Sequence, residues 1–129
     1  MTPNPDASLP ANDGPPVDFE QLLSAAAADP EVLQELVGLY FDQARQIMEG
    51  LAEAARKPSA RDVGYLAHKL VGASLACGMS AVVPALRELE SRARNGDLAG
   101  ADALMTSAAA KLELVRLTVQ EYLAQHKKP

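Results

Sequence analysis

Apolar positions return every three or four residues over long stretches of this chain, the spacing that gathers them on one face of an α-helix. The clearest stretch is DPEVLQELVGLYFDQARQIMEGLAEAARK, residues 29–57. Asp29 is a suitable helix cap, Pro30 fits the first helical position and Glu31 fits the first turn. We therefore predict a long amphipathic helix here. Its apolar face consists of Leu33, Leu36, Val37, Tyr40, Phe41, Ala44, Ile47, Met48 and Leu51.

A shorter helix is predicted before this one and another directly after it. The segment VDFEQLLSAAAA has the composition of a short first helix, with Asp18 as its cap. Pro58 ends the long second helix, because proline cannot continue it. Ser59 or Asp62 can begin a third helix, and Gly78 is a natural stop for it.

Two further helices complete the pattern. The segment AVVPALRELESRARN predicts a fourth helix that begins between Ser80 and Pro84, since proline is tolerated only in the first turn. The segment DLAGADALMTSAAAKLELVRLTVQEYLAQ predicts the last one. We find no strand pattern and no internal repeat. Four long helices with short connections pack best as an antiparallel four-helix bundle, so the predicted fold is all-α, with the short N-terminal helix as an additional cap.

Composition agrees with a helical fold and narrows the function. Alanine and leucine supply most of the 48 % hydrophobic content, and aromatic residues make up only 4 %. The single cysteine, Cys77, excludes an internal disulfide and a multi-cysteine metal site, so we expect a reducing, cytoplasmic location. A net charge of -5 argues against nucleic-acid binding, and no apolar run is long enough to span a membrane. The expected partners are proteins.

The N-terminal segment differs in composition from the rest of the chain. Five of the nine prolines lie in the first 16 residues, beside Asn, Asp and Ser, and the segment lacks the basic start and apolar core of a signal peptide. We predict a flexible leader over residues 1–16, a helical bundle over 17–126 and a charged tail over 127–129.

The candidate chemistry lies in the third helix, where GYLAHKLVGASLACG places His68 among small residues. At about 100° per residue, an apolar stripe falls opposite His68, so this histidine faces away from the core. The stripe consists of Val63, Leu66, Leu70, Ser74 and Cys77. The face of His68 itself carries Arg61, Gly64, Tyr65, Val71, Gly72 and Leu75.

These neighbours are unusual for a solvated helix face. A glycine inside a helix costs roughly 0.5–1 kcal/mol relative to alanine, yet Gly64 and Gly72 lie one turn before and after His68. Their missing side chains would clear space around the imidazole. The remaining apolar neighbours, Tyr65, Val71 and Leu75, would then form a docking patch for a partner. The second histidine, His126, lies in the polar tail and fits a structural or incidental role.

Few reactions are open to one exposed histidine in this setting. An unperturbed imidazole has a pKa near 6.5, so it is largely neutral at pH 7 and a ring nitrogen can act as a nucleophile. Metal binding would need further ligands on the same face, and acyl transfer would need a Ser or Cys there, whereas Ser74 and Cys77 turn toward the core. The chain has no Gly-rich phosphate loop. We therefore predict no kinase activity, no metal and no cofactor; His68 would accept a group from a partner protein.

The segment AHKLVGASLACG resembles the signature of histidine-containing phosphotransfer (Hpt) domains. His68, Leu70, Gly72, Ser74 and Gly78 fall in register with it, and LRELE, residues 86–90, matches the Leu-Glu element that follows. The resemblance extends from about residue 17 to residue 125. It implies a phosphorelay intermediate that shuttles a phosphoryl group through His68 between receiver domains of a hybrid histidine kinase and of a response regulator. The receivers would supply Mg²⁺ and their own lysine, and a monomer would suffice.

One position departs from the family pattern. Val71 stands where the family usually has lysine, three residues after the histidine, while Lys69 follows the histidine directly. The expected phosphoryl environment is therefore Lys69, Gly72, Arg61 and Gly64, with the cation coming from Lys69, from Arg61 or from the partner. Two other functions stay open: a non-catalytic bundle that binds and inhibits a histidine kinase or receiver domain, with His68 only as a contact, and a purely structural helical module.

Overall fold

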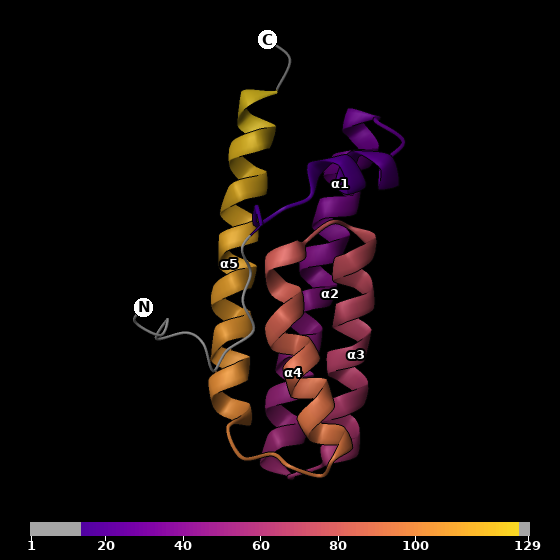
Figure 1. Cartoon of the computed structure of the whole chain (residues 1–129). Helices are drawn as coiled ribbons and strands as arrows, with labels where there is room; N and C mark the ends of the chain where they lie inside the picture. Colours follow the sequence, from indigo (N-terminus) through magenta and orange to yellow (C-terminus); the bar gives the residue numbers. More distant parts are fainter. Residues whose placement is uncertain (1–13, 127–129) are drawn as a thin grey trace, which may run out of the picture.

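The computed structural model describes residues 14–126, which form the predicted all-α bundle (Figure 1). The elements are α1 (Phe19–Ala25), α2 (Pro30–Arg56), α3 (Ala60–Ala76), a 3₁₀ turn η1 (Ser80–Val82), α4 (Val83–Arg94) and α5 (Ala101–Gln125). Each of the helices α2 to α5 runs antiparallel to the one before it, and α1 covers the end at which α2 begins. The prediction of an antiparallel four-helix bundle with a short N-terminal helix is thus confirmed.

Side-chain caps fix the start of the first three helices as the sequence predicts. The carboxylate of Asp18 accepts a hydrogen bond from the backbone N–H of Gln21 at 3.1 Å. Asp29 caps α2 in the same way, accepting from the N–H of Glu31 at 2.9 Å, and Pro30 occupies the first helical position. Ser59, rather than Asp62, is the cap of α3. Each cap satisfies a donor that the helix itself leaves unpaired.

The fifth helix begins later than predicted. The sequence pattern starts it at residue 97, but the first helical residue is Ala101. Gly100 adopts a left-handed conformation with φ +80°, and the Asp97 carboxylate accepts a hydrogen bond from the N–H of Ala99 at 3.0 Å. These local bonds form a turn that competes with helix formation. The fourth helix begins within the predicted window, at Val83 after the 3₁₀ turn, with Pro84 in its first turn.

Helix α3 packs extensively against α4 and α2. It makes no contact with α5. The core contains the predicted stripe of α3, with Val63, Leu70 and Ser74 fully buried. At the far end of α3, Gly78 has φ +73°, and a Cβ atom there would lie 2.3 Å from the carbonyl oxygen of Asp18. The N–H of Asp18 also donates to the Gly78 carbonyl at 2.7 Å. Glycine at this position therefore lets the start of α1 close over the bundle.

The chain joins the bundle at Pro16, whose carbonyl accepts a hydrogen bond from the N–H of Ala81 at 3.0 Å. The leader predicted over residues 1–16 lies outside the described residues except for its last three positions, and the tail predicted over 127–129 lies wholly outside them. Within residues 14–126, none of the helices has the length and apolar content needed to cross a membrane.

Candidate functional site

His68 lies in the middle of α3, with its side chain 68 % exposed. The predicted orientation away from the core is therefore correct. Ala67, directly before His68, and Leu70, two residues after it, are fully buried. Because those buried contacts hold the backbone of α3 against its neighbours, the histidine is presented from a rigid helix rather than from a loop.

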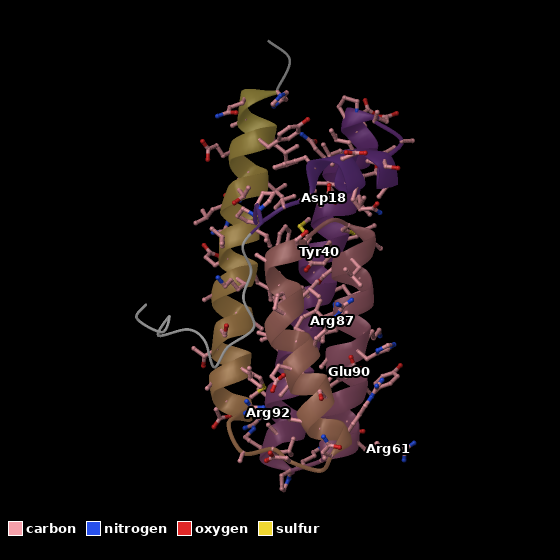
Figure 2. The ribbon with its side chains drawn as sticks, in the orientation of Figure 1. Asp18, Tyr40, Arg61, Arg87, Glu90 and Arg92 are labelled. Atoms are coloured by element: carbon pink, nitrogen blue, oxygen red, sulfur yellow. The ribbon has the colours of Figure 1, made fainter. Side chains whose placement is uncertain are left out.

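One ring nitrogen of His68 is bound to a carboxylate from the neighbouring helix. Nδ1 lies 2.8 Å from Oε2 of Glu90 in α4, whose side chain is only 11 % exposed. The same oxygen accepts a hydrogen bond from Nη2 of Arg94 at 2.5 Å. Three side chains from two helices thus meet at a single atom, on the side of α4 that faces α3 (Figure 2).

The Glu90 contact assigns different roles to the two ring nitrogens. A carboxylate paired with arginine is ionised, so it can only accept a hydrogen bond, and Nδ1 of His68 must be the donor. With the proton on Nδ1, the lone pair of the neutral imidazole lies on Nε2. The exposed nitrogen is therefore the nucleophilic one.

Sequence reasoning did not identify Glu90 or Arg94 as site residues. Glu90 lies within the LRELE segment that carries the family resemblance, and the helical spacing of Arg94, four residues later, places it on the same face. A glutamate among the buried positions of α4 was the available signal, because a buried carboxylate requires a partner. The sequence could not show that α3 supplies that partner.

The surface of α3 near His68 is open at Gly72, one turn beyond the histidine. A Cβ atom built at Gly72 would meet nothing within 4 Å, and Tyr65 and Leu75 are both exposed. These three residues were predicted to surround the imidazole, and their exposure on this face is confirmed. Whether they contact a partner stays a prediction.

Two of the predicted site residues are not on the exposed surface around His68. Val71 is only 6 % exposed, so the prediction that it contributes to an exposed docking patch is wrong. Gly64 is half-buried, and a Cβ atom there would lie 3.5 Å from the Cβ of Ala93 in α4. Residues seven apart share one side of a helix, so Val71 lies on the same flank of α3 as Gly64. Gly64 therefore allows close helix packing and does not clear space above the imidazole.

The two predicted cations are on the surface of α3 and form no ion pair with any other described residue. Arg61 projects from the beginning of the helix, near the end of the bundle (Figure 2). Lys69 follows His68 directly, and so its side chain leaves the helix about 100° around the axis from the imidazole. Neither forms a hydrogen bond or ion pair with His68.

The other potential nucleophiles of α3 are inside the protein, as predicted. Ser74 is fully buried, and its Oγ lies 2.7 Å from the hydroxyl oxygen of Tyr40 in α2. Burial raises the pKa of the Tyr40 hydroxyl well above its usual range, although the Ser74 hydrogen bond opposes that shift. Burial likewise raises the pKa of the Cys77 thiol. Neither Ser74 nor Cys77 can act at the surface that carries His68.

His126 has a different environment from His68. Its ring stacks on Tyr122, with 4.0 Å between the ring centroids, and Tyr122 in turn stacks on Phe19 of α1. Nδ1 of His126 lies 2.9 Å from the backbone carbonyl of Tyr122. Tyr122 thus joins α5 to α1, and His126 stacks on the other side of this ring, with no acidic partner among residues 14–126.

The fold and this site define a helical bundle that presents one exposed histidine, oriented by a carboxylate, on a rigid helix. A family model described as the Hpt domain matches residues 35–126 of the chain. The chain therefore belongs to the Hpt domain family, whose members are phosphoryl carriers in phosphorelays and interact there with receiver domains and kinases.

A solved structure gives the same fold. The chain is similar to histidine-containing phosphotransfer protein B (HptB) from Pseudomonas aeruginosa PAO1, with a TM-score of 0.80 and 22 % sequence identity. The similarity covers 89 % of this chain and 100 % of that one. No curated protein sequence gives a significant match.

Proposed function

We propose that this protein carries a phosphoryl group on Nε2 of His68, taking it from an aspartyl phosphate of one receiver domain and passing it to the aspartate of another. The observation that supports this proposal best is the contact of Nδ1 with Glu90, because it leaves the lone pair on the nitrogen that faces solvent. A nucleophile held in one orientation on a rigid helix needs little reorganisation to react.

The proposed step balances without a proton transfer. The Nε2 lone pair attacks phosphorus, the bond between phosphorus and the aspartate oxygen breaks, and the aspartate leaves with that electron pair as a carboxylate. The imidazole ring becomes cationic and keeps its Nδ1 proton on Glu90. That carboxylate stabilises the positive ring as it forms, which is the role a carboxylate has beside a catalytic histidine elsewhere. The reverse step transfers the group to the second receiver.

The receiver would dock on the surface formed by α3 and α2. Tyr65, Gly72 and Leu75 contribute from α3. Leu39 contributes from α2: it is exposed, and it lies three turns before Gly50, where a Cβ atom would be 3.1 Å from Leu66 of α3. Residues three turns apart share one face, so Leu39 lies along the edge of α2 that borders α3. An exposed apolar patch of this kind is typical of an interaction surface.

Because phosphoryl transfer depends mainly on positioning and charge, the partner can supply the cations that stabilise the phosphoryl group during transfer. We propose that the receiver domain brings Mg²⁺ and its own lysine, and that this chain contributes the nucleophile and the docking surface. The partners at the two ends of the relay would be a hybrid kinase and a response regulator, each with a phosphorylatable aspartate in a receiver domain.

The test is a phosphotransfer assay with phosphorylated receiver domains from the same genome. We expect acid-labile phosphate on the wild-type protein and none on the His68→Gln variant, with unchanged helical content by circular dichroism, because the imidazole is mostly exposed. His126→Gln is the control and should accept phosphate normally. Phosphate on the His68→Gln protein would overturn the assignment. Receiver binding without any phosphate uptake would support the non-catalytic inhibitor instead.

A further inference from the structure

A phosphoryl group on His68 would place new negative charge beside an existing one. The group adds up to two negative charges at neutral pH. Glu90, whose carboxylate contacts the same imidazole, already carries one. Like charges bound to the two nitrogens of one imidazole ring repel each other, and a nearby cation reduces that repulsion. The residue that would supply that cation in the family pattern is replaced by the buried Val71.

Most cations of the described chain are already engaged elsewhere. Six of the lysine and arginine side chains in residues 14–126 form ion pairs: Arg45, Arg56, Lys57, Arg92, Arg94 and Arg116. Four others have no ion-pair partner among these residues: Arg61, Lys69, Arg87 and Lys111. Of the six paired cations, Arg94 alone binds a residue that also binds His68.

The Arg94 guanidinium and the His68 imidazole bind the same carboxylate oxygen. Nη2 of Arg94 lies 2.5 Å from Oε2 of Glu90, and Nδ1 of His68 lies 2.8 Å from that same oxygen. A guanidinium has five N–H donors, and the hydrogen bond to Glu90 uses one of them. The Arg94 side chain is 70 % exposed, so it can turn on its long stem without disturbing the core.

The unpaired cations are less suitably placed. Arg61 precedes His68 by seven residues, which is about 10 Å along the helix axis. Lys69 leaves α3 about 100° around the axis from His68 and forms no hydrogen bond or ion pair with His68 or Glu90. Arg87 lies on α4 and forms no hydrogen bond or ion pair with Glu90 or His68. Lys111 belongs to α5, which makes no contact with α3.

We propose that Arg94 binds the phosphoryl group carried by His68 and supplies from α4 the positive charge that position 71 of α3 lacks. In the unphosphorylated protein Arg94 neutralises Glu90. After transfer, its free N–H groups donate to the phosphoryl oxygens while the imidazole keeps its Nδ1 hydrogen bond to Glu90. This inference rests on the proposed function of His68 as phosphoryl acceptor.

A small phosphoryl donor tests Arg94 without a receiver domain. With potassium phosphoramidate, Nε2 of His68 bonds to phosphorus, the phosphorus–nitrogen bond breaks, and the protonated nitrogen leaves as ammonia with the electron pair. We expect Arg94→Gln to lower the rate of His68 phosphorylation about fivefold, because it removes one charge-assisted contact. Arg94→Lys keeps the positive charge, so its rate should lie between those of Arg94→Gln and the wild type. The pH midpoint of the phosphohistidine ³¹P titration should rise by about half a unit in Arg94→Gln, because a nearby cation favours the dianion.

Arg92→Gln is the matched control. Arg92 also lies in the last turns of α4 and pairs with a glutamate four residues earlier, Glu88, but it has no contact with His68. Its substitution removes the same charge and the same kind of ion pair. We expect phosphorylation of His68 and its ³¹P titration to stay as in the wild type.

A double-variant cycle separates direct binding from an effect through Glu90. If Arg94 contacts the phosphoryl group, Arg94→Gln slows phosphorylation in the Glu90→Gln background as well, and the ³¹P midpoint still rises. If Arg94 only orients Glu90, it has no further effect there, and the proposal is wrong. A wild-type protein that takes up no phosphate on His68 from phosphoramidate or any receiver would overturn the proposed function itself. Normal uptake in wild type, Arg94→Gln and Arg92→Gln alike would overturn only the role of Arg94.

Discussion

Glu90 and His68 lie on neighbouring helices, 22 residues apart in the sequence, and are joined by a hydrogen bond of 2.8 Å. The two side chains that form this bond differ in how tightly the protein holds them. The glutamate is nearly buried and held by Arg94, whereas the imidazole is mostly exposed. The carboxylate therefore determines the orientation of the imidazole and which of its nitrogens is protonated. The histidine does not determine the position of the carboxylate.

Replacing this carboxylate with an amide should impair the nucleophile without removing it. In Glu90→Gln, the side chain can donate to Nδ1 as well as accept from it, so the Nε2–H tautomer becomes populated and the lone pair leaves the exposed nitrogen. Loss of a charged hydrogen bond corresponds to about 1.5–3 kcal/mol, and we expect His68 phosphorylation by phosphoramidate to slow by about ten- to a hundredfold. Long-range ¹H–¹⁵N spectra of the imidazole should show the change of tautomer.

Glu88→Gln controls for the loss of a carboxylate on α4. Glu88 also pairs with an arginine four residues later, Arg92, but it does not touch His68. Phosphorylation and the imidazole spectrum should stay unchanged in this variant. If Glu90→Gln reacted as fast as Glu88→Gln, orientation by Glu90 would have no role in the reaction.

The helices were predictable because each is encoded locally. Asp18, Asp29 and Ser59 cap three helices as their positions in the sequence indicate, and the apolar stripes match the buried faces. The start of α5 was not predictable from periodicity, because the pattern continues through residues 97–100 while a left-handed glycine and an aspartate turn interrupt the helix. There, local backbone chemistry prevailed over the hydrophobic pattern.

The site was predictable only as far as one helix determines it. The helical arithmetic placed His68, Gly72 and Leu75 on an exposed face, and they are exposed. It placed Val71 and Gly64 on the same face, but Val71 is buried and Gly64 packs against Ala93 of α4. The angle around a single helix does not show where the next helix packs, and for the same reason the sequence could not join Glu90 to His68.

The buried pair of Tyr40 and Ser74 should make the fold sensitive to alkaline pH. Burial raises the pKa of Tyr40 above the value of 10.0 that an unburied tyrosine has, so above pH 10 the unfolded chain loses this proton while the folded protein keeps it. The free energy of unfolding must then fall as pH rises, by about 1 kcal/mol for this group between pH 9 and pH 11. Urea unfolding at the two pH values measures the change.

Tyr40→Phe isolates the contribution of this hydroxyl. The variant leaves the Ser74 hydroxyl buried without a partner and should lose about 1–3 kcal/mol at neutral pH. Tyr40→Phe with Ser74→Ala removes both hydroxyls and should recover part of that loss. Both variants should show a smaller alkaline decrease than the wild type, and an identical decrease would mean that Tyr40 does not titrate differently in the folded and unfolded states.

The connection between α1 and α2 should be a site of stored strain. Ala27 and Ala28 both have a left-handed backbone, with φ of 53° and 55°, which costs an L-residue about 1 kcal/mol or more. Both side chains are exposed, so glycine would relieve the strain and remove little packing. We expect Ala27→Gly and Ala28→Gly each to raise the midpoint of thermal unfolding. Ala110→Gly, at an exposed helical position of α5, should lower it; a decrease in all three variants would show that the connection is not strained.

Gly72 should affect the partner's access to His68 and leave the intrinsic reactivity of the imidazole unchanged. A Cβ atom at this position meets nothing within 4 Å, so Gly72→Leu fits the folded protein and should stabilise α3 by up to about 1 kcal/mol through its higher helix propensity. The new side chain lies one turn beyond His68 on the open face, where it would hold a receiver domain away from the imidazole. Transfer from a phosphorylated receiver should fall sharply, while phosphorylation by phosphoramidate, a donor small enough to pass, should stay normal.

Gly38 and Gly64 are the two control positions for this prediction. Gly38 is also an exposed helical glycine with nothing within 4 Å of a Cβ atom. It lies on the side of α2 opposite the buried Tyr40 and about 100° around the axis from Leu39, so Gly38→Leu should give the same stabilisation and leave both reactions unchanged. Gly64→Leu should destabilise the bundle, because its side chain would enter the contact with Ala93 of α4. If Gly72→Leu slowed the phosphoramidate reaction as much as the receiver reaction, the leucine would be disturbing the imidazole itself. The open space above position 72 would then have no role in admitting a partner.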